Sequence, residues 1–101
     1  MKGFGNKSYS KKTSKKCKYK NPSKEKIINQ AYKFASQGNL LEAEKCYKLF
    51  LKKGFVDARV DMNLAQIFFK EGKLKEAEKF LKKAIEIKPD FAEAYYNLGL
   101  V

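Results

Sequence analysis

The sequence predicts an all-α protein made of consecutive pairs of antiparallel helices, and three observations lead to this prediction. From Ser23 onward, apolar residues recur at helical spacing. The segment FASQGNLLEAEKCY is echoed by FFKEGKLKEAEKFL, so that Gly38 and Gly72 lie 34 residues apart. A third copy begins at Ala92, where Asn97 follows Asn63 by the same 34 residues. Self-similarity at a fixed period of this length is typical of helical repeat proteins.

The segment before the repeats, residues 1–22, differs in composition from the rest of the chain. It carries eight lysines and no acidic residue, and so supplies eight of the twelve net positive charges. A segment with so much charge of one sign buries too little apolar surface to offset its chain entropy, so we expect a disordered basic arm. Its lysines interleave with Phe4, Tyr9 and Tyr19. This pattern is compatible with RNA binding, with contact to an anionic lipid surface, or with a purely solubilising tail.

Helices are expected near residues 23–37, 40–53, 57–71, 74–87 and 91–101. The first two are separated at Gly38-Asn39, where Gly38 is free to adopt a positive φ. Asn39 is placed to cap the second helix, and Glu42 three residues later completes a capping-box pattern. Such a short connection makes the two helices antiparallel, and Gly72 predicts the same turn in the second copy.

The repeat boundaries that follow are 23–57 for a first, divergent repeat, 58–91 for a second repeat and 92–101 for an incomplete third. Small residues recur where helices must approach closely, and larger ones fill the space between them. The small set is Ala31, Ala43, Ala65, Ala77 and Ala84, and the large set is Phe34, Tyr47, Phe68 and Leu81. We interpret both sets as core.

Composition argues against most catalytic chemistry. The chain has no His, which excludes His-dependent triads, His-ligated metals and His proton shuttles. Cys17 and Cys46 lie 29 residues apart with no further thiol to complete a metal set. There is also no apolar run of the length that a signal peptide or a membrane span needs. We therefore predict a cytoplasmic protein that is not an enzyme and binds no cofactor.

The 34-residue unit resembles the tetratricopeptide repeat (TPR), a helix-turn-helix whose signature residues sit at fixed offsets. The second copy matches it at Leu64, Ala65, Phe68, Gly72, Ala77, Leu81, Ala84 and Pro89, and the third at Tyr95, Leu98 and Gly99. The first copy departs from the pattern, with Phe50 in place of a small Ala and Phe55 in place of Pro. The resemblance implies a TPR α-solenoid of two full repeats plus a partial third.

The resemblance also implies a scaffold that binds a protein or peptide ligand in a concave groove formed by the first helix of each repeat. Asn29, Asn63 and Asn97 recur at one position per repeat. They resemble the asparagine ladder of O-linked N-acetylglucosamine transferases, which would bond a peptide backbone, although Asn is also an ordinary polar residue at this position. The other residues expected in the groove are Tyr32, Met62, Gln66 and Tyr96.

The last helix has no following helix to cover Tyr95, Leu98 and Leu100, so we expect self-association through it. The incomplete third repeat favours the start of a longer array, or a truncated copy of one. By the same resemblance, an alternative is the N-terminal part of a TPR-containing glycosyltransferase or sulfotransferase whose catalytic domain is not in this sequence.

Overall fold

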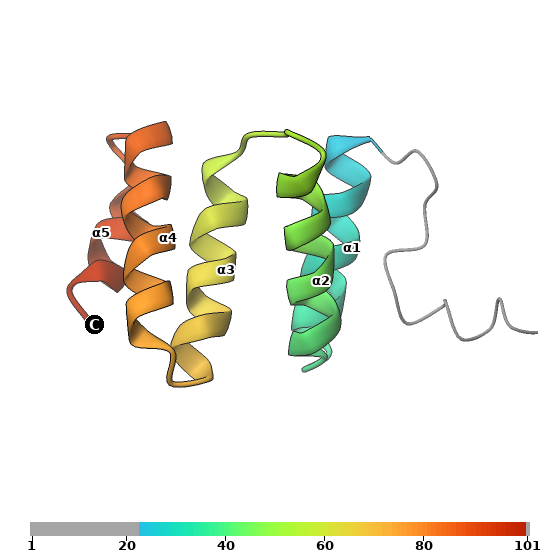
Figure 1. The fold of residues 1–101 in the computed structure, drawn as a ribbon, viewed down its shortest axis with the longest axis horizontal. Coiled ribbons are helices and arrows are strands. Elements are labelled where there is room, and N and C mark those ends of the chain that lie inside the picture. The colour runs from blue at the N-terminus through green and yellow to red at the C-terminus, as the bar shows by residue number, and fades with distance from the viewer. Residues whose placement is uncertain (1–22, 101) are drawn as a thin grey trace, which may run out of the picture. The chain divides into compact units, whose positions relative to one another are not determined.

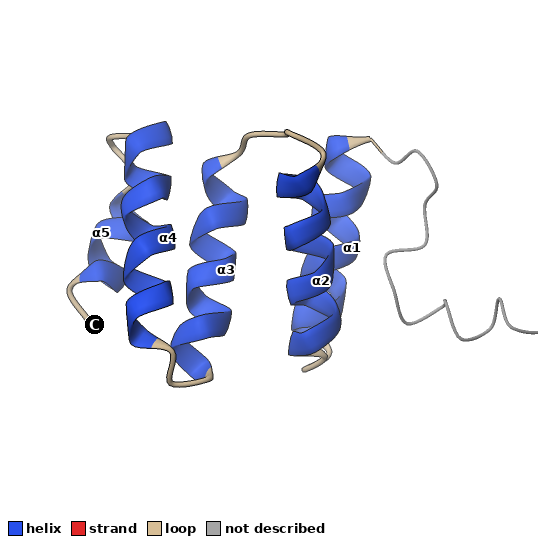
Figure 2. Ribbon diagram, in the orientation of Figure 1, coloured by secondary structure: helices blue, strands red, loops and turns tan. Residues whose placement is uncertain are grey.

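The computed structural model describes residues 23–100, and in this range it consists of helices and loops without a strand (Figures 1 and 2). The helices are α1 (Lys24–Ser36), α2 (Leu40–Lys52), α3 (Ala58–Lys70), α4 (Leu74–Ile87) and α5 (Ala92–Leu98). The all-α prediction is confirmed, and the first four helices end within one residue of their expected bounds. The predicted disordered arm, residues 1–22, lies outside the described range. No helix within that range is long and apolar enough to cross a bilayer.

The fifth helix is shorter than expected, because it ends at Leu98 and not near residue 101. Gly99 follows as the C-cap, and its amide donates to the carbonyls of Tyr95 and Tyr96. Glycine costs about 1 kcal/mol relative to alanine inside a helix, so it favours an end at this position. The expected bound assumed that the helix continues through Gly99.

The described chain forms two compact units, which divide between Leu49 and Phe50. In the first unit, α1 and the part of α2 up to Leu49 form an antiparallel pair (Figure 1). Ser23 is the N-cap of α1, and its hydroxyl accepts a 3.3 Å hydrogen bond from the Lys26 backbone amide. Its buried face comprises Ile27, Ile28, Ala31 and Phe34, at the spacing that one side of a helix requires.

The turn between α1 and α2 confirms the glycine prediction and corrects the capping one. Gly38 has a φ of 82°, and the backbone amide of Asn39 donates to the Phe34 carbonyl at 2.8 Å. In a capping box, the Glu42 side chain would accept a hydrogen bond from this backbone amide. The amide is already bonded to Phe34, so the predicted capping box is wrong. Glu42 instead lies 3.7 Å from the Lys45 ammonium through Oε2, while its buried Oε1 accepts no hydrogen bond in the described chain.

The two departures from the TPR signature lie against each other in the second unit. Phe50 is fully buried, and its ring centroid lies 5.3 Å from that of Phe55, with the planes tilted by 59°. This geometry falls in the favourable range for aromatic pairs. Gly54, with a φ of 85°, makes the turn that brings the two rings together. The two residues that depart from the TPR signature therefore pack against each other.

The second unit is centred on α3 and α4, which pack antiparallel, with α5 beside α4 (Figure 1). Asp57 caps α3 by accepting a 2.9 Å hydrogen bond from the Arg59 amide. The predicted core residues here are confirmed as buried: Ala65, Phe68, Ala77, Leu81 and Ala84. Tyr95 donates a 2.9 Å hydrogen bond to the Pro89 carbonyl, which ties α5 to the loop before it.

Because Gly72 has a φ of 79°, replacing it by alanine is expected to lower the free energy of unfolding by about 1–2 kcal/mol. No atom of residues 23–100 lies within 4 Å of the added Cβ, so the cost arises from the backbone conformation. Gly99→Ala is the matched control: its φ of −68° suits alanine, so stability is expected to be unchanged or up to about 1 kcal/mol higher. Urea denaturation followed by circular dichroism measures both, and equal effects would contradict the assignment of strain to Gly72.

Candidate functional site

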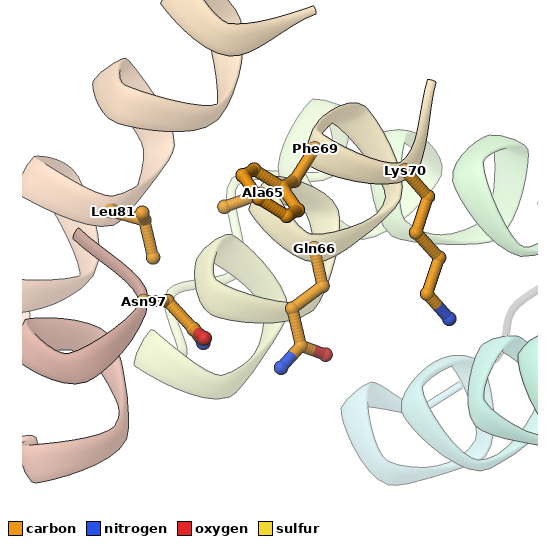
Figure 3. Close-up of a pocket in the computed structure, with 6 residues that line it drawn as sticks. All are labelled: Ala65, Gln66, Phe69, Lys70, Leu81 and Asn97. Carbon is orange, nitrogen blue, oxygen red and sulfur yellow. The ribbon is translucent and has the colours of Figure 1, made fainter. Parts of the chain in front are cut away.

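A pocket of about 250 Å³ opens in the second unit, where α3, α4 and α5 meet (Figure 3). Its lining residues are Ala65, Gln66, Phe69 and Lys70 from α3, Leu81 from α4 and Asn97 from α5. The four α3 residues form two pairs spaced four apart, so successive turns of one helix face present them. The pocket thus follows from helical periodicity and from the packing of three neighbouring segments.

The inner wall of this pocket is apolar. Ala65 and Leu81 are each 1% exposed and close its base, whereas Phe69 is 40% exposed and forms an accessible side. In Figure 3 the Phe69 ring lies between Leu81 and Lys70. The ring therefore offers an aromatic surface to any group that enters.

Polar groups surround the opening and retain unused hydrogen-bonding capacity. Asn97 donates through Nδ2 to the Met62 sulfur at 3.5 Å, a weak bond that leaves its Oδ1 unpaired within the described chain. In the same range, the side-chain amide of Gln66 makes no hydrogen bond, and the Lys70 ammonium makes no ion pair. By contrast, Lys48 and Lys82 pair with Glu44 and Glu78 at 2.8 and 3.0 Å. The opening thus offers hydrogen-bond donors, acceptors and one cation to a ligand.

Comparison with known protein families gives one match, which coincides with this part of the chain. Residues 65–101 match a family model described as a TPR repeat. The chain carries a TPR repeat. The matched segment contains all six residues that line the pocket. TPR repeats are in general scaffolds for protein–protein interaction, and a comparison with curated proteins finds no match to this chain.

On α3 and α5, the structure brings three of the predicted site residues together. Gln66 and Asn97 line the same pocket, and Met62 contacts Asn97. Met62 is only 5% exposed, however, so it supports the Asn97 side chain and presents little surface of its own. Asn63 is half-buried, and Tyr96 is 70% exposed.

The remaining predicted site residues, Asn29 and Tyr32, are exposed on α1 in the first unit. Sequence reasoning did not place Ala65 and Leu81 in a site, because it assigned them only to the core. It missed Phe69 and Lys70 altogether. Their spacing of four from Ala65 and Gln66 was the available signal, since it puts them on the same face of the TPR helix.

Asp61, which lies on α3 before the matched segment, is a second feature that the sequence analysis missed. Its side chain is fully buried on α3, and neither carboxylate oxygen accepts a hydrogen bond from residues 23–100. Burial raises the pKa of Asp61 from 3.8 to about 6, while Lys83, 3.9 Å away on α4, lowers it and Asp57 raises it. Asp61 lies 34 residues after Ile27 and 34 before Tyr95. The other two repeats therefore have a bulky residue at this position, and this was the available signal in the sequence.

Proposed function

We propose that this chain is a non-catalytic scaffold that holds an extended peptide along the first helices of its repeats. The observation that carries the proposal is the pocket of the matched TPR segment, whose opening combines the unpaired Gln66 amide with Asn97 Oδ1. A peptide backbone presents donors and acceptors at regular intervals, and a side-chain amide can bond either kind. Asn97 thus has the chemistry that backbone recognition requires, while Gln66 can bond a polar peptide side chain.

The proposed contacts divide into two groups. Asn29, Asn63 and Asn97 would bond successive amides of the peptide, because each occupies the same position of its repeat. Tyr32, Gln66 and Tyr96 would contact peptide side chains. Met62 enters this scheme through Asn97, whose amide it helps to orient.

The test is the triple replacement of Asn29, Asn63 and Asn97 by alanine. A peptide-display library selected on the immobilised chain supplies the ligands, and fluorescence anisotropy measures their affinity. Each lost bond is expected to cost about 0.5–1.5 kcal/mol, so the triple variant should bind roughly 10- to 1000-fold more weakly. The loss should be similar for peptides of unrelated sequence, since the bonds involve the backbone.

Gln37→Ala is the control, because it removes an exposed amide from the turn after α1. Circular dichroism verifies that the helix content of both variants is unchanged. Unchanged affinity in the triple variant would show that the three asparagines are ordinary polar residues of the repeat without a role in binding. Failure of the library to yield any ligand would contradict the scaffold itself.

A further inference from the structure

We propose that the pocket between α3, α4 and α5 binds one aromatic side chain of a peptide ligand, with an acidic residue of the same peptide beside Lys70. This inference rests on the proposed function, because it names the class of peptide that the scaffold selects. It adds sequence specificity to recognition that the asparagines alone would leave independent of sequence.

The size and lining of the pocket favour a single large apolar group. An apolar cavity of about 150 Å³ in another protein accommodates benzene, so about 250 Å³ has room for an aromatic ring. The base formed by Ala65 and Leu81 offers no polar atom from a side chain, and the Phe69 ring supplies a partner for stacking or edge contact. A polar side chain entering this base would lose its hydrogen bonds to water without replacement.

Charge at the opening determines which residue accompanies the aromatic one. Lys70 is exposed at the C-terminal end of α3 and forms no ion pair within residues 23–100. The sequence as a whole carries a net charge of +12, which also attracts acidic ligands at long range. Donation from Lys70 and from the adjacent Gln66 amide suits a carboxylate.

The charged residues around the pocket also determine at which end of the pocket the acidic residue binds. Helix α5 runs in the same direction as α3 (Figure 1), so Glu93 in the first turn of α5 lies at the opposite end from Lys70. Glu93 precedes Asn97 by four residues and shares its helix face. A carboxylate at that end would be repelled, whereas one beside Lys70 would be attracted.

The experiment uses the full chain and short acetylated peptides in which one Phe adjoins a pair of Asp residues, made in both sequence orders. Matched peptides carry Ala in place of Phe, or Lys in place of both Asp residues. Burial of the ring predicts roughly 10-fold tighter binding of the Phe peptide than of its Ala counterpart. One of the two sequence orders should bind better, and exchange of Asp for Lys should abolish that preference.

Variants of the chain locate the effect. Lys70→Glu is expected to weaken binding of the Phe-Asp peptide about 3- to 10-fold, whereas Lys75→Glu on α4 makes the same charge change outside the pocket and should alter binding less than about 2-fold. Phe69→Ala should weaken binding about 5-fold or more, while Leu74→Ala removes a similarly exposed apolar side chain without effect. Amide chemical-shift changes in a 15N-labelled chain should concentrate at residues 65–70 and 97.

Three outcomes would overturn the proposal. The first is equal binding of the Phe and Ala peptides, which leaves the proposed function intact if library peptides still depend on the three asparagines. The second is an equal loss from Lys70→Glu and Lys75→Glu, which would indicate general charge attraction. The third is a concentration-dependent shift of the pocket amides without peptide, which would identify a second copy of the chain as the occupant.

Discussion

Replacing Leu81 by alanine is expected to lower the free energy of unfolding by about 2–5 kcal/mol. Leu81 lies on α4 with 1% of its surface exposed, at the base of the pocket where α3, α4 and α5 meet. Its truncation removes apolar contacts and enlarges a space that the neighbouring helices close only in part. Because small domains are stable by about 5–15 kcal/mol, this one change could remove a large part of the total.

Two further variants test whether the loss arises from packing. Leu74→Ala alters the same residue type at the start of α4, where the side chain is 48% exposed, and is expected to change stability by about 0.5 kcal/mol or less. Leu81→Met keeps most of the volume and should cost less than about 1.5 kcal/mol. Urea denaturation followed by circular dichroism measures all three, and a similar loss for Leu81→Ala and Leu74→Ala would contradict the central position of Leu81.

Replacing Asp61 by leucine is expected to raise stability at neutral pH by about 2–3 kcal/mol. The carboxylate is buried and accepts no hydrogen bond within the described part of the chain. The Lys83 ammonium at 3.9 Å offsets only part of the cost of removing the carboxylate from water. A pKa raised from 3.8 to about 6 corresponds to an energetic cost of about 3 kcal/mol for the ionised form. Asp61→Asn keeps the shape but leaves an amide without partners, so its gain should be smaller, about 1–2 kcal/mol.

The pH dependence of these gains has a definite sign. Because the folded pKa of Asp61 exceeds the unfolded one, the folded state binds the proton more tightly, and Asp61 disfavours folding progressively as the pH rises from about 4 to above 6. The advantage of Asp61→Leu over the natural chain should therefore be larger at about pH 7.5 than at about pH 4, by roughly 2–3 kcal/mol. Taking the difference between two chains cancels the titration of groups that they share.

Asp90→Asn serves as the control, since it removes a carboxylate that is exposed in the loop between α4 and α5. Its effect on stability should stay within about 0.5 kcal/mol at either pH. If Asp61→Leu gave the same small effect, the carboxylate would have to be hydrated or paired in solution.

The sequence predicted the helices and their turns well because these features depend on local rules. Helical spacing marks the buried face of each helix, and Gly38 and Gly72 mark turns that need a positive φ. The capping box failed because two local interactions competed for one group. The backbone amide of Asn39 donates to the Phe34 carbonyl at the end of the preceding helix. This amide is therefore not free to bond the Glu42 side chain.

The candidate site was less accessible from sequence because it depends on which helices converge. Asn97 and Gln66 were expected in one groove, and the structure places both at one pocket. Phe69 was missed because its spacing of four from Ala65 places it on that helix face but does not show that the face borders a pocket. Met62 was expected to line the groove, yet it is buried, because the Asn97 side chain of α5 lies against it.

The short glycine turns also bear on how the chain folds during its synthesis. Only residues 71–73 separate α3 from α4, so the contacts between these helices join residues that are close in sequence. Proteins of such low contact order fold in microseconds to milliseconds, whereas a ribosome adds about 5–20 residues per second. The pair formed by α3 and α4 therefore has time to assemble before many further residues emerge, and α5 then docks onto a surface that already exists.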